Sequence, residues 1–376
     1  MPIYANSTIN PGAEIVLKPA LSKLKHIGSF DGLRAISIIC VLLNHLGIYL
    51  LLPKTNFFQQ RVWPLFAGGT GVNIFFVLSG FLITRILLTE MEGKGNISLK
   101  HFYIRRALRL LPALLLFFTI IAGLMIFHLL FPSVASFFYS FFYLYNFVPP
   151  SLQVPELIHT WSLAVEEQFY FTWPLILILF NSRKAFYIGA FLICLCILAK
   201  IILPGIKITV GDRSLPFTEV YRTGTWFIPA VAPIIIGSIM SIAIFNNKGI
   251  AESIHGNHRF CLFLSFILFI SPLYLASFLA EYAYFIQSLG VALLLAVLLL
   301  NQKTMAAGIL GAGPLAYVGK ISYGIYVFQG LFLRNGPGGK LLIQQFPQNL
   351  VLTLLCAILS YHFVEKPILR LKEKFR

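Results

Sequence analysis

The sequence predicts an all-α polytopic membrane protein, with about ten transmembrane helices in one bundle and both termini in the cytoplasm. Two observations predict this class. The 376 residues are 58% hydrophobic and only 11% charged, about half the charged fraction of a soluble domain. Apolar runs of about 20 residues, the length that crosses a bilayer as a helix, recur along the whole chain. The first 30 residues lack a compact apolar core, so no cleavable signal peptide is expected.

The predicted spans follow from these apolar runs, in the order 33–52, 68–89, 108–130, 162–180, 185–204, 226–245, 260–279, 283–300, 314–333 and 348–364. Ten spans place both termini on one side. Twenty Lys and Arg fall on that side and eight on the other, with Lys320 unassigned. Because positive residues accumulate in cytoplasmic loops, both termini are predicted to be cytoplasmic. The net charge of +16 therefore indicates topology, and no nucleic-acid partner is expected.

The chain divides into a cytoplasmic tail over 1–29, one membrane domain over 30–370 and a cytoplasmic tail over 371–376. The cytoplasmic connection 90–107 is the most basic segment. The external stretch 131–161 is rich in aromatic residues and Pro, which favours a re-entrant or interfacial segment. A second external loop is charged and could face a polar substrate; it contains Asp212, Arg213, Glu219 and Arg222. The five cysteines all lie in apolar spans, so neither a disulfide nor a metal site is expected.

Arg34 and His45 are two ionisable residues of the first span. If this segment is a helix, they lie about 16 Å apart along its axis and only about 20° apart around it, and Asp31 falls near the same stripe. A snorkelling side chain is the stronger interpretation of Arg34 alone. His45 falls past the membrane midplane, where an ionisable side chain is costly and calls for a function. Imidazole accepts and returns a proton near neutral pH, so His45 is a candidate catalytic residue.

Three arginines cluster where the third span begins: Arg105, Arg106 and Arg109. Their spacing of three and four residues lets pairs of them share one helical face. Arginine binds phosphate through planar, bidentate hydrogen bonds. Positive charge at this position is equally well explained by membrane orientation, so both interpretations stay open.

Two adjacent glutamates, Glu166 and Glu167, open the fourth span within the segment 160–170 (TWSLAVEEQFY). A helix N-terminus favours negative charge, which explains one carboxylate more easily than two. The alternative is a carboxylate that orients a histidine or binds sugar hydroxyls. The two side chains point about 100° apart, so at most one faces a given cavity, and the sequence leaves open which one.

Six segments, in this order, resemble the acyltransferase-3 family of bacterial membrane acyltransferases, which O-acetylate surface polysaccharides and other glycans. The resemblance covers about 30–370, and its segments are Phe-Asp-Gly-Leu-Arg at 30–34 with His45, GVNIFFVLSGFLI at 71–83, and those at 102–112, 160–170, 321–326 and 364–367. It implies that Arg34 and His45 match the essential arginine–histidine pair of the family. It also implies that Arg106 and Arg109 match its arginine pair on the cytoplasmic side.

The resemblance implies a multi-pass protein of the bacterial cytoplasmic (inner) membrane. Acetyl-CoA would be the acyl donor, without a metal, and the acceptor a surface glycan or lipid-linked sugar, such as lipopolysaccharide O-antigen. We assign donor binding to Arg34, Arg105, Arg106 and Arg109, and catalysis to His45 with Arg34, Glu166 and Glu167. Contact with substrate is assigned to Asp31, Trp161, Gln168, Tyr170 and Tyr323. The sequence departs from many members at Asn73, Trp226 and Gln329, which puts the identity of the substrate in doubt.

Our hypothesis is therefore acetyl transfer, with His45 as the general base on a sugar hydroxyl or as the first acceptor of the acetyl group. A proton-coupled transporter or flippase of a lipid-linked glycan is an alternative. Acylation of a small metabolite at the cytoplasmic face is another. The sequence does not identify the acceptor hydroxyl, the acyl chain or the oligomeric state.

Overall fold

The computed structural model describes residues 27–130, 133–203, 223–275, 282–334, 336, 339 and 341–371. Within these ranges the chain forms helices and turns and no strand, which confirms the all-α class. The charged residues 212, 213, 219 and 222 of the second external loop lie outside the described residues, as do 1–26 and 372–376 of the two tails.

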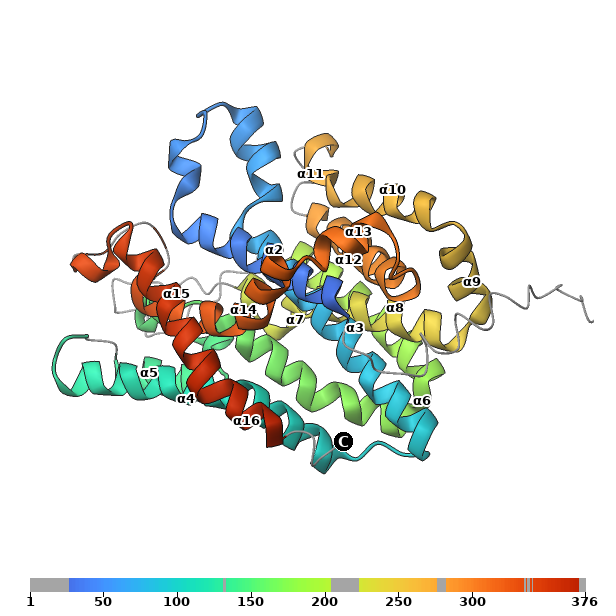
Figure 1. Cartoon of the computed structure of the whole chain (residues 1–376), viewed down its shortest axis with the longest axis horizontal. Helices are drawn as coiled ribbons and strands as arrows, with labels where there is room; N and C mark the ends of the chain where they lie inside the picture. The colour runs from blue at the N-terminus through green and yellow to red at the C-terminus, as the bar shows by residue number, and fades with distance from the viewer. Residues whose placement is uncertain are drawn as a thin grey trace, which may run out of the picture.

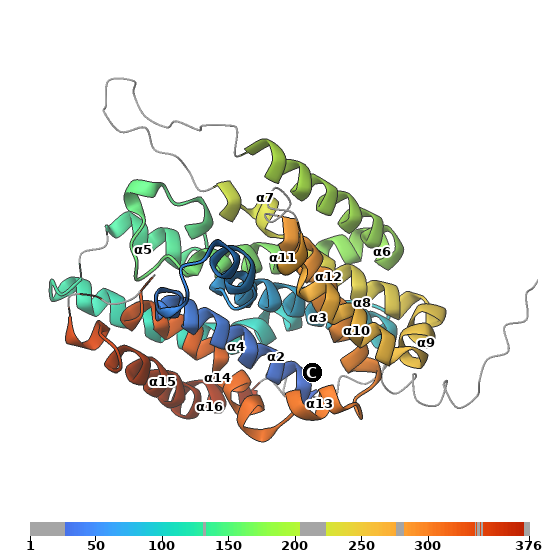
Figure 2. The ribbon, with the colours of Figure 1, turned by 90° about the horizontal axis from the view of Figure 1, so that it is seen from above.

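The helices are, in chain order, α2 (Gly28–His45), α3 (Gly68–Lys94), α4 (Leu99–Ile126), α5 (Val134–Phe141), α6 (Thr160–Ile202), α7 (Phe227–Ala230), α8 (Ala232–Asn246), α9 (Lys248–Gly256), α10 (His258–Phe269), α11 (Ser271–Tyr274), α12 (Ala283–Leu300), α13 (Met305–Leu310), α14 (Gly313–Phe332), α15 (Gln348–Ser360) and α16 (Lys366–Arg370). A short π-helix, Tyr361–Glu365, joins α15 to α16. Figure 1 shows α2 and α14 in the middle of this array. In both views α15 and α16 lie on one side and α9 and α10 on the opposite side (Figures 1 and 2).

Five helical stretches in the described part of the chain are long and apolar enough to cross a membrane: Phe58–Lys94, Leu99–Ile126, Thr160–Ile202, Ala283–Leu300 and Gln348–Arg370. A sixth results if α8 and α9, which are bent by 101°, form one span. Each predicted span overlaps at least one helix of the described residues. The number of ten crossings is not confirmed and stays a prediction, because α2 and α14 reach spanning length but not the same apolarity, α10 is shorter, and α6 joins two predicted spans.

Two predicted boundaries differ from the structure. The expected spans 162–180 and 185–204 are not separated by a loop, because α6 continues through both and breaks only at Asn181 (φ 55°, ψ 172°). The first expected span ran to residue 52, whereas α2 ends at His45. Gly47 adopts a left-handed conformation (φ 71°) two residues later, and glycine in this conformation commonly terminates helices.

Close backbone packing holds α2 in place. This helix packs against α14 on one side and α3 on another. Gly319 of α14 lies against the main chain of Asp31, and Gly71 of α3 lies against the main chain of Ser37, so neither position has room for a Cβ atom. The Ser37 hydroxyl also donates a hydrogen bond to the Gly71 carbonyl. Small residues that let helix backbones meet are typical of membrane bundles, and here they fix the helix that carries both Arg34 and His45.

Candidate active site

A cavity of about 840 Å³ opens among α2, α3, α4, α6 and α14. Many of the residues selected from the sequence line it: Asp31, Arg34, Arg105, Arg106, Arg109, Glu166, Tyr170 and Tyr323. These residues come from segments far apart in the sequence. The fold therefore brings the arginine cluster together with the first residues of α2, as a shared site requires. Functional sites in helical bundles are commonly built in this way, between facing helices.

Arg34 and Arg106 are held in different ways inside this cavity. The Arg34 guanidinium forms an ion pair of 2.6 Å with Asp31, one helical turn away. The Arg106 guanidinium lies over the Tyr170 ring, with its central carbon 3.8 Å from the ring centroid. The buried Nε of Arg106 has no hydrogen-bond partner among the described residues. Arg106 is thus positioned by stacking and keeps hydrogen-bonding capacity for a ligand.

Positive charge exceeds negative charge at this end of the cavity. Arg109 lies close enough to Arg34 and Arg106 for their charges to interact. Glu166 lies near Ser79, Tyr170, Arg106 and Arg109. The lining as a whole has six basic side chains and three carboxylates, an excess of positive charge that suits an anionic group such as a phosphate: Arg34, Arg85, Lys94, Arg105, Arg106 and Arg109 against Asp31, Glu90 and Glu166.

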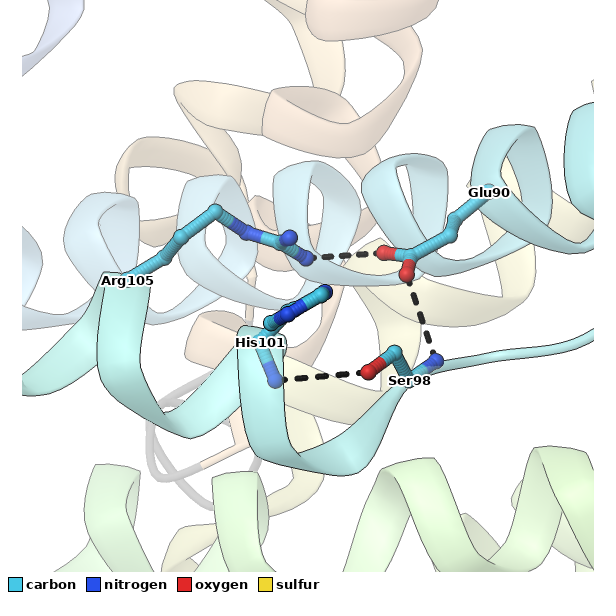
Figure 3. Close-up of polar contacts among 4 residues, drawn as sticks. All are labelled: Glu90, Ser98, His101 and Arg105. Atoms are coloured by element: carbon cyan, nitrogen blue, oxygen red, sulfur yellow. Dashed lines mark hydrogen bonds and ion pairs between the residues drawn. The ribbon is translucent and has the colours of Figure 1, made fainter. Parts of the chain in front are cut away.

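Arg105 differs from its neighbour because its charge is already balanced. Its Nη2 lies 2.7 Å from Oε2 of Glu90, and the other oxygen of that carboxylate accepts a hydrogen bond from the Ser98 main chain at 3.2 Å (Figure 3). The Ser98 hydroxyl in turn caps α4 by accepting from the His101 main-chain N–H (Figure 3). This network ties the turn between α3 and α4 to both helices, so Arg105 has a structural task that Arg106 lacks.

His45 lies at the opposite end of α2, outside the cavity lining. It is 8% exposed, and its Nδ1 is 2.8 Å from Oε1 of Gln329, a fully buried residue of α14. The expected carboxylate is not the partner of this imidazole, because Glu166 lies with the arginines. In the sequence Gln329 stands out only as a departure from the family pattern, and its contact with His45 becomes visible in the structure.

Tyr326 is a residue of α14 that lies one helical turn before Gln329. It lines the cavity together with Ser162. Its hydroxyl lies 2.5 Å from the Ser162 hydroxyl and donates to the main-chain carbonyl of His159 at 2.9 Å. The Tyr326 ring also packs edge-on against Phe75, another lining residue, at 6.2 Å. These contacts link the cavity lining to His159, which lies near His45.

His159 is a second buried histidine in this region. It lies in the turn before α6, with its ring edge-on to those of Phe117 and Tyr326 at 5.6 Å each. Burial and, to a smaller extent, the nearby His45 lower the pKa of His159 to about 3, which favours the neutral ring. Its only sequence signal is its place directly before the segment 160–170.

The remaining selected residues do not line the cavity. Gln168 exchanges hydrogen bonds with the Asn146 side chain at 3.0 and 3.1 Å and donates to the Tyr143 carbonyl at 2.9 Å, so it fastens the stretch before α6 to that helix. Trp161 packs edge-on against Phe76. Glu167 is outside the cavity lining as well. The residues assigned to one site from the sequence thus form two groups in the structure: those that line the cavity, and those, such as Gln168, that lie outside its lining.

The family model described as "Acyltransferase domain" matches residues 27–363. The chain belongs to the acyltransferase-3 family. It is 29% identical over 374 residues to the peptidoglycan O-acetyltransferase OatA of Listeria monocytogenes serovar 1/2a. It is 28% identical over 373 residues to YrhL, a candidate peptidoglycan O-acetyltransferase of Bacillus subtilis (strain 168). A candidate O-acetyltransferase of Staphylococcus aureus (strain COL) is 27% identical over 375 residues.

These three alignments cover 92% of the chain but only 56%, 55% and 58% of the relatives, so the chain spans a little over half of their length. No solved structure matches the chain.

Proposed function

We propose that this chain is a membrane O-acyltransferase that moves an acetyl group from cytoplasmic acetyl-CoA to a hydroxyl group of a cell-surface glycan. One observation carries the proposal. A single rigid helix presents Arg34 to an arginine-lined cavity at one end and His45 at the other. The two residues are about 16 Å apart along the axis, a separation that suits a long donor with anionic groups at one end and a reactive thioester at the other.

The arginine end would bind the phosphates of the donor. Arg106 and Arg109 are the strongest candidates, because Arg105 is neutralised by Glu90 and Arg34 by Asp31. These side chains fit an anion: the guanidinium groups are partly buried, the basic side chains that line the cavity exceed the carboxylates in number, and Arg106 retains a buried N–H without a partner among the described residues. A planar guanidinium can donate two parallel hydrogen bonds to a phosphate, which a lysine cannot.

His45 would act as the general base. It takes the proton of the acceptor hydroxyl while that oxygen attacks the carbonyl carbon of the thioester. A C–O ester bond forms, the C–S bond breaks, and the thiolate leaves and takes the proton from His45. The histidine returns to its neutral state and no other reactant is consumed. His45 does not line the cavity, so direct transfer of this kind needs a movement that opens a way from the lining residue Tyr326 to His45.

The acceptor is proposed to be a glycan of the cell surface. Two relatives are named for the O-acetylation of peptidoglycan. They support a sugar hydroxyl as the acceptor group and favour peptidoglycan over the lipopolysaccharide O-antigen expected from the sequence. The proposed setting is the bacterial cytoplasmic membrane, with ten crossings, both termini in the cytoplasm and the donor entering from that side. The acetyl group then crosses the permeability barrier while the donor remains inside.

The proposal is tested by mass spectrometry of alkali-labile acetyl esters on the surface glycans of cells that express the wild-type chain or His45→Ala at equal membrane levels. The wild-type cells should carry the ester and the variant cells should lack it. Equal ester content in both would overturn the proposal, and flux of an unmodified glycan would point to a transporter.

A further inference from the structure

The contact between His45 and Gln329 determines which ring nitrogen of His45 carries the proton. Nδ1 of His45 lies 2.8 Å from Oε1 of Gln329. An amide oxygen only accepts hydrogen bonds, so with this orientation of the Gln329 amide Nδ1 is the donor. A neutral imidazole that is protonated on Nδ1 has its lone pair on Nε2. Nε2 is then the only ring nitrogen that can act as a base.

We propose that Gln329 is a positioning residue that holds His45 in the Nδ1–H tautomer, with Nε2 directed to the acceptor hydroxyl. This inference rests on the proposed function, in which His45 is the base. Two packed helices fix the geometry, because His45 is the last residue of α2, Gln329 belongs to α14, and the two helices pack against each other. Triads of hydrolytic enzymes use a carboxylate for the same purpose of orienting the imidazole.

The surroundings of Gln329 support a dedicated role. The residue is fully buried, and its Nε2 has no hydrogen-bond partner among the described residues. A buried unpaired donor is unfavourable, and an apolar residue of similar shape would avoid this cost. The bond to His45 is the one hydrogen bond of its side chain in the described structure. An amide also orients the ring without adding a negative charge to an apolar region.

The tautomer is measured directly by NMR of protein labelled with ¹⁵N-histidine in detergent micelles, with His45→Asn used to assign the resonances. The His45 signals should be those of a protonated Nδ1 and an unprotonated Nε2. A protonated Nε2 would overturn the proposal, because it would mean that the Gln329 amide is reversed and donates to Nδ1. This readout needs no substrate, so it stands whether or not acetyl transfer is observed.

Enzyme kinetics test the consequence for catalysis. Gln329→Leu removes the acceptor and should lower kcat about 100-fold, within the range of general-base effects, while KM for acetyl-CoA is unchanged. Gln329→Glu restores an acceptor for Nδ1–H and should recover most of kcat. Gln287→Leu is the matched control, since Gln287 is a buried glutamine of α12 that donates to the Phe269 carbonyl. This variant should keep the wild-type kcat.

Two kinetic results would contradict the proposal: full kcat in Gln329→Leu, or an equal loss in Gln329→Leu and Gln287→Leu. If Gln329→Leu does not fold, the kinetics of Gln329→Glu and the wild-type NMR spectrum decide, and loss of kcat in Gln329→Glu then counts against the proposal. A wild-type protein that releases no CoA from acetyl-CoA would instead overturn the proposed function, and the tautomer result would remain.

Discussion

The two ends of α2 present opposite environments to the side chains they carry. At the Arg34 end, guanidinium groups and carboxylates line a cavity of about 840 Å³. At the His45 end, the described hydrogen-bond partner of the imidazole is the neutral amide of Gln329. Charged side chains thus lie at the Arg34 end, where an anion would bind. The partner of His45, where the proton would be transferred, is neutral. The difference suggests that one rigid helix joins two separable tasks, binding and chemistry.

The substitution with the largest expected effect, at His45, separates acetyl transfer from donor binding. His45→Ala removes the proposed base and should lower acetyl transfer about 1,000-fold, within the range of general acid–base effects. Binding of acetyl-CoA should be unchanged, because His45 lies outside the cavity lining. Transfer is measured with labelled acetyl-CoA and binding by isothermal titration calorimetry. A variant that loses both together would contradict the separation of the two ends.

Substitution of an arginine at the other end of α2 should weaken donor binding and leave the rate of transfer nearly unchanged. Arg106→Ala removes a charged hydrogen-bond donor, which is worth about 1.5–3 kcal/mol, so KM for acetyl-CoA should rise about 10- to 100-fold while kcat changes little. Arg106→Lys should not restore KM, since lysine neither stacks on Tyr170 in the same way nor binds in a bidentate manner. The exposed Arg183 provides a control, and Arg183→Ala should match the wild type. An unchanged KM in Arg106→Ala would remove Arg106 from the donor site.

We expect Tyr326 to separate the two ends, because it lines the cavity and contacts His159, which lies near His45. Tyr326→Ala should connect the cavity with His45 and admit water, so that CoA release in the absence of acceptor increases several-fold. Tyr326→Phe keeps the ring and loses only the contacts with Ser162 and His159, so its background hydrolysis should stay near the wild-type value. Both rates are followed with a thiol reagent. No increase in Tyr326→Ala would show that the side chain is not the barrier.

The smallest effect concerns the Glu90–Arg105 pair, which the structure assigns to the scaffold. A double-mutant cycle with Glu90→Gln and Arg105→Gln should give a coupling energy of about 0.5–3 kcal/mol, as measured by thermal unfolding. KM for acetyl-CoA should remain near the wild-type value in Arg105→Gln. A rise as large as that expected for Arg106→Ala would show that Arg105 binds the donor too.

Local sequence patterns predicted the helices well, because hydrophobic length is a property of each segment alone. The span expected at 283–300 coincides with α12, and the first span fails only at its end, where Gly47 stops α2. Arg34 and Arg106, both assigned to the donor site, line one cavity. Helical spacing and arginine chemistry left other interpretations of both residues open, and the family resemblance supplied the assignment.

Contacts between distant segments could not be predicted in this way. Gln329 and His45 are 284 positions apart, and only the packing of α14 against α2 shows that they meet. Arg105 and Arg106 are adjacent and chemically identical, and the tertiary contact with Glu90 alone separates their tasks. In both cases the role of the side chain depends on the residues that the fold places beside it, and residue type alone does not indicate that role.

The central claim is that acetyl-CoA binds from the cytoplasmic side and that the acetyl group is transferred across the membrane at His45. The most direct test supplies the donor to one side of the membrane at a time. Membrane vesicles of inside-out and right-side-out orientation are supplied with external radiolabelled acetyl-CoA, which does not cross the membrane, and the label in alkali-labile glycan esters is counted. If the donor binds at a cytoplasmic arginine end and His45 transfers the acetyl group across the barrier, only inside-out vesicles should acquire label, and His45→Ala should abolish it. Equal labelling in both orientations, or labelling that survives His45→Ala, would contradict the account.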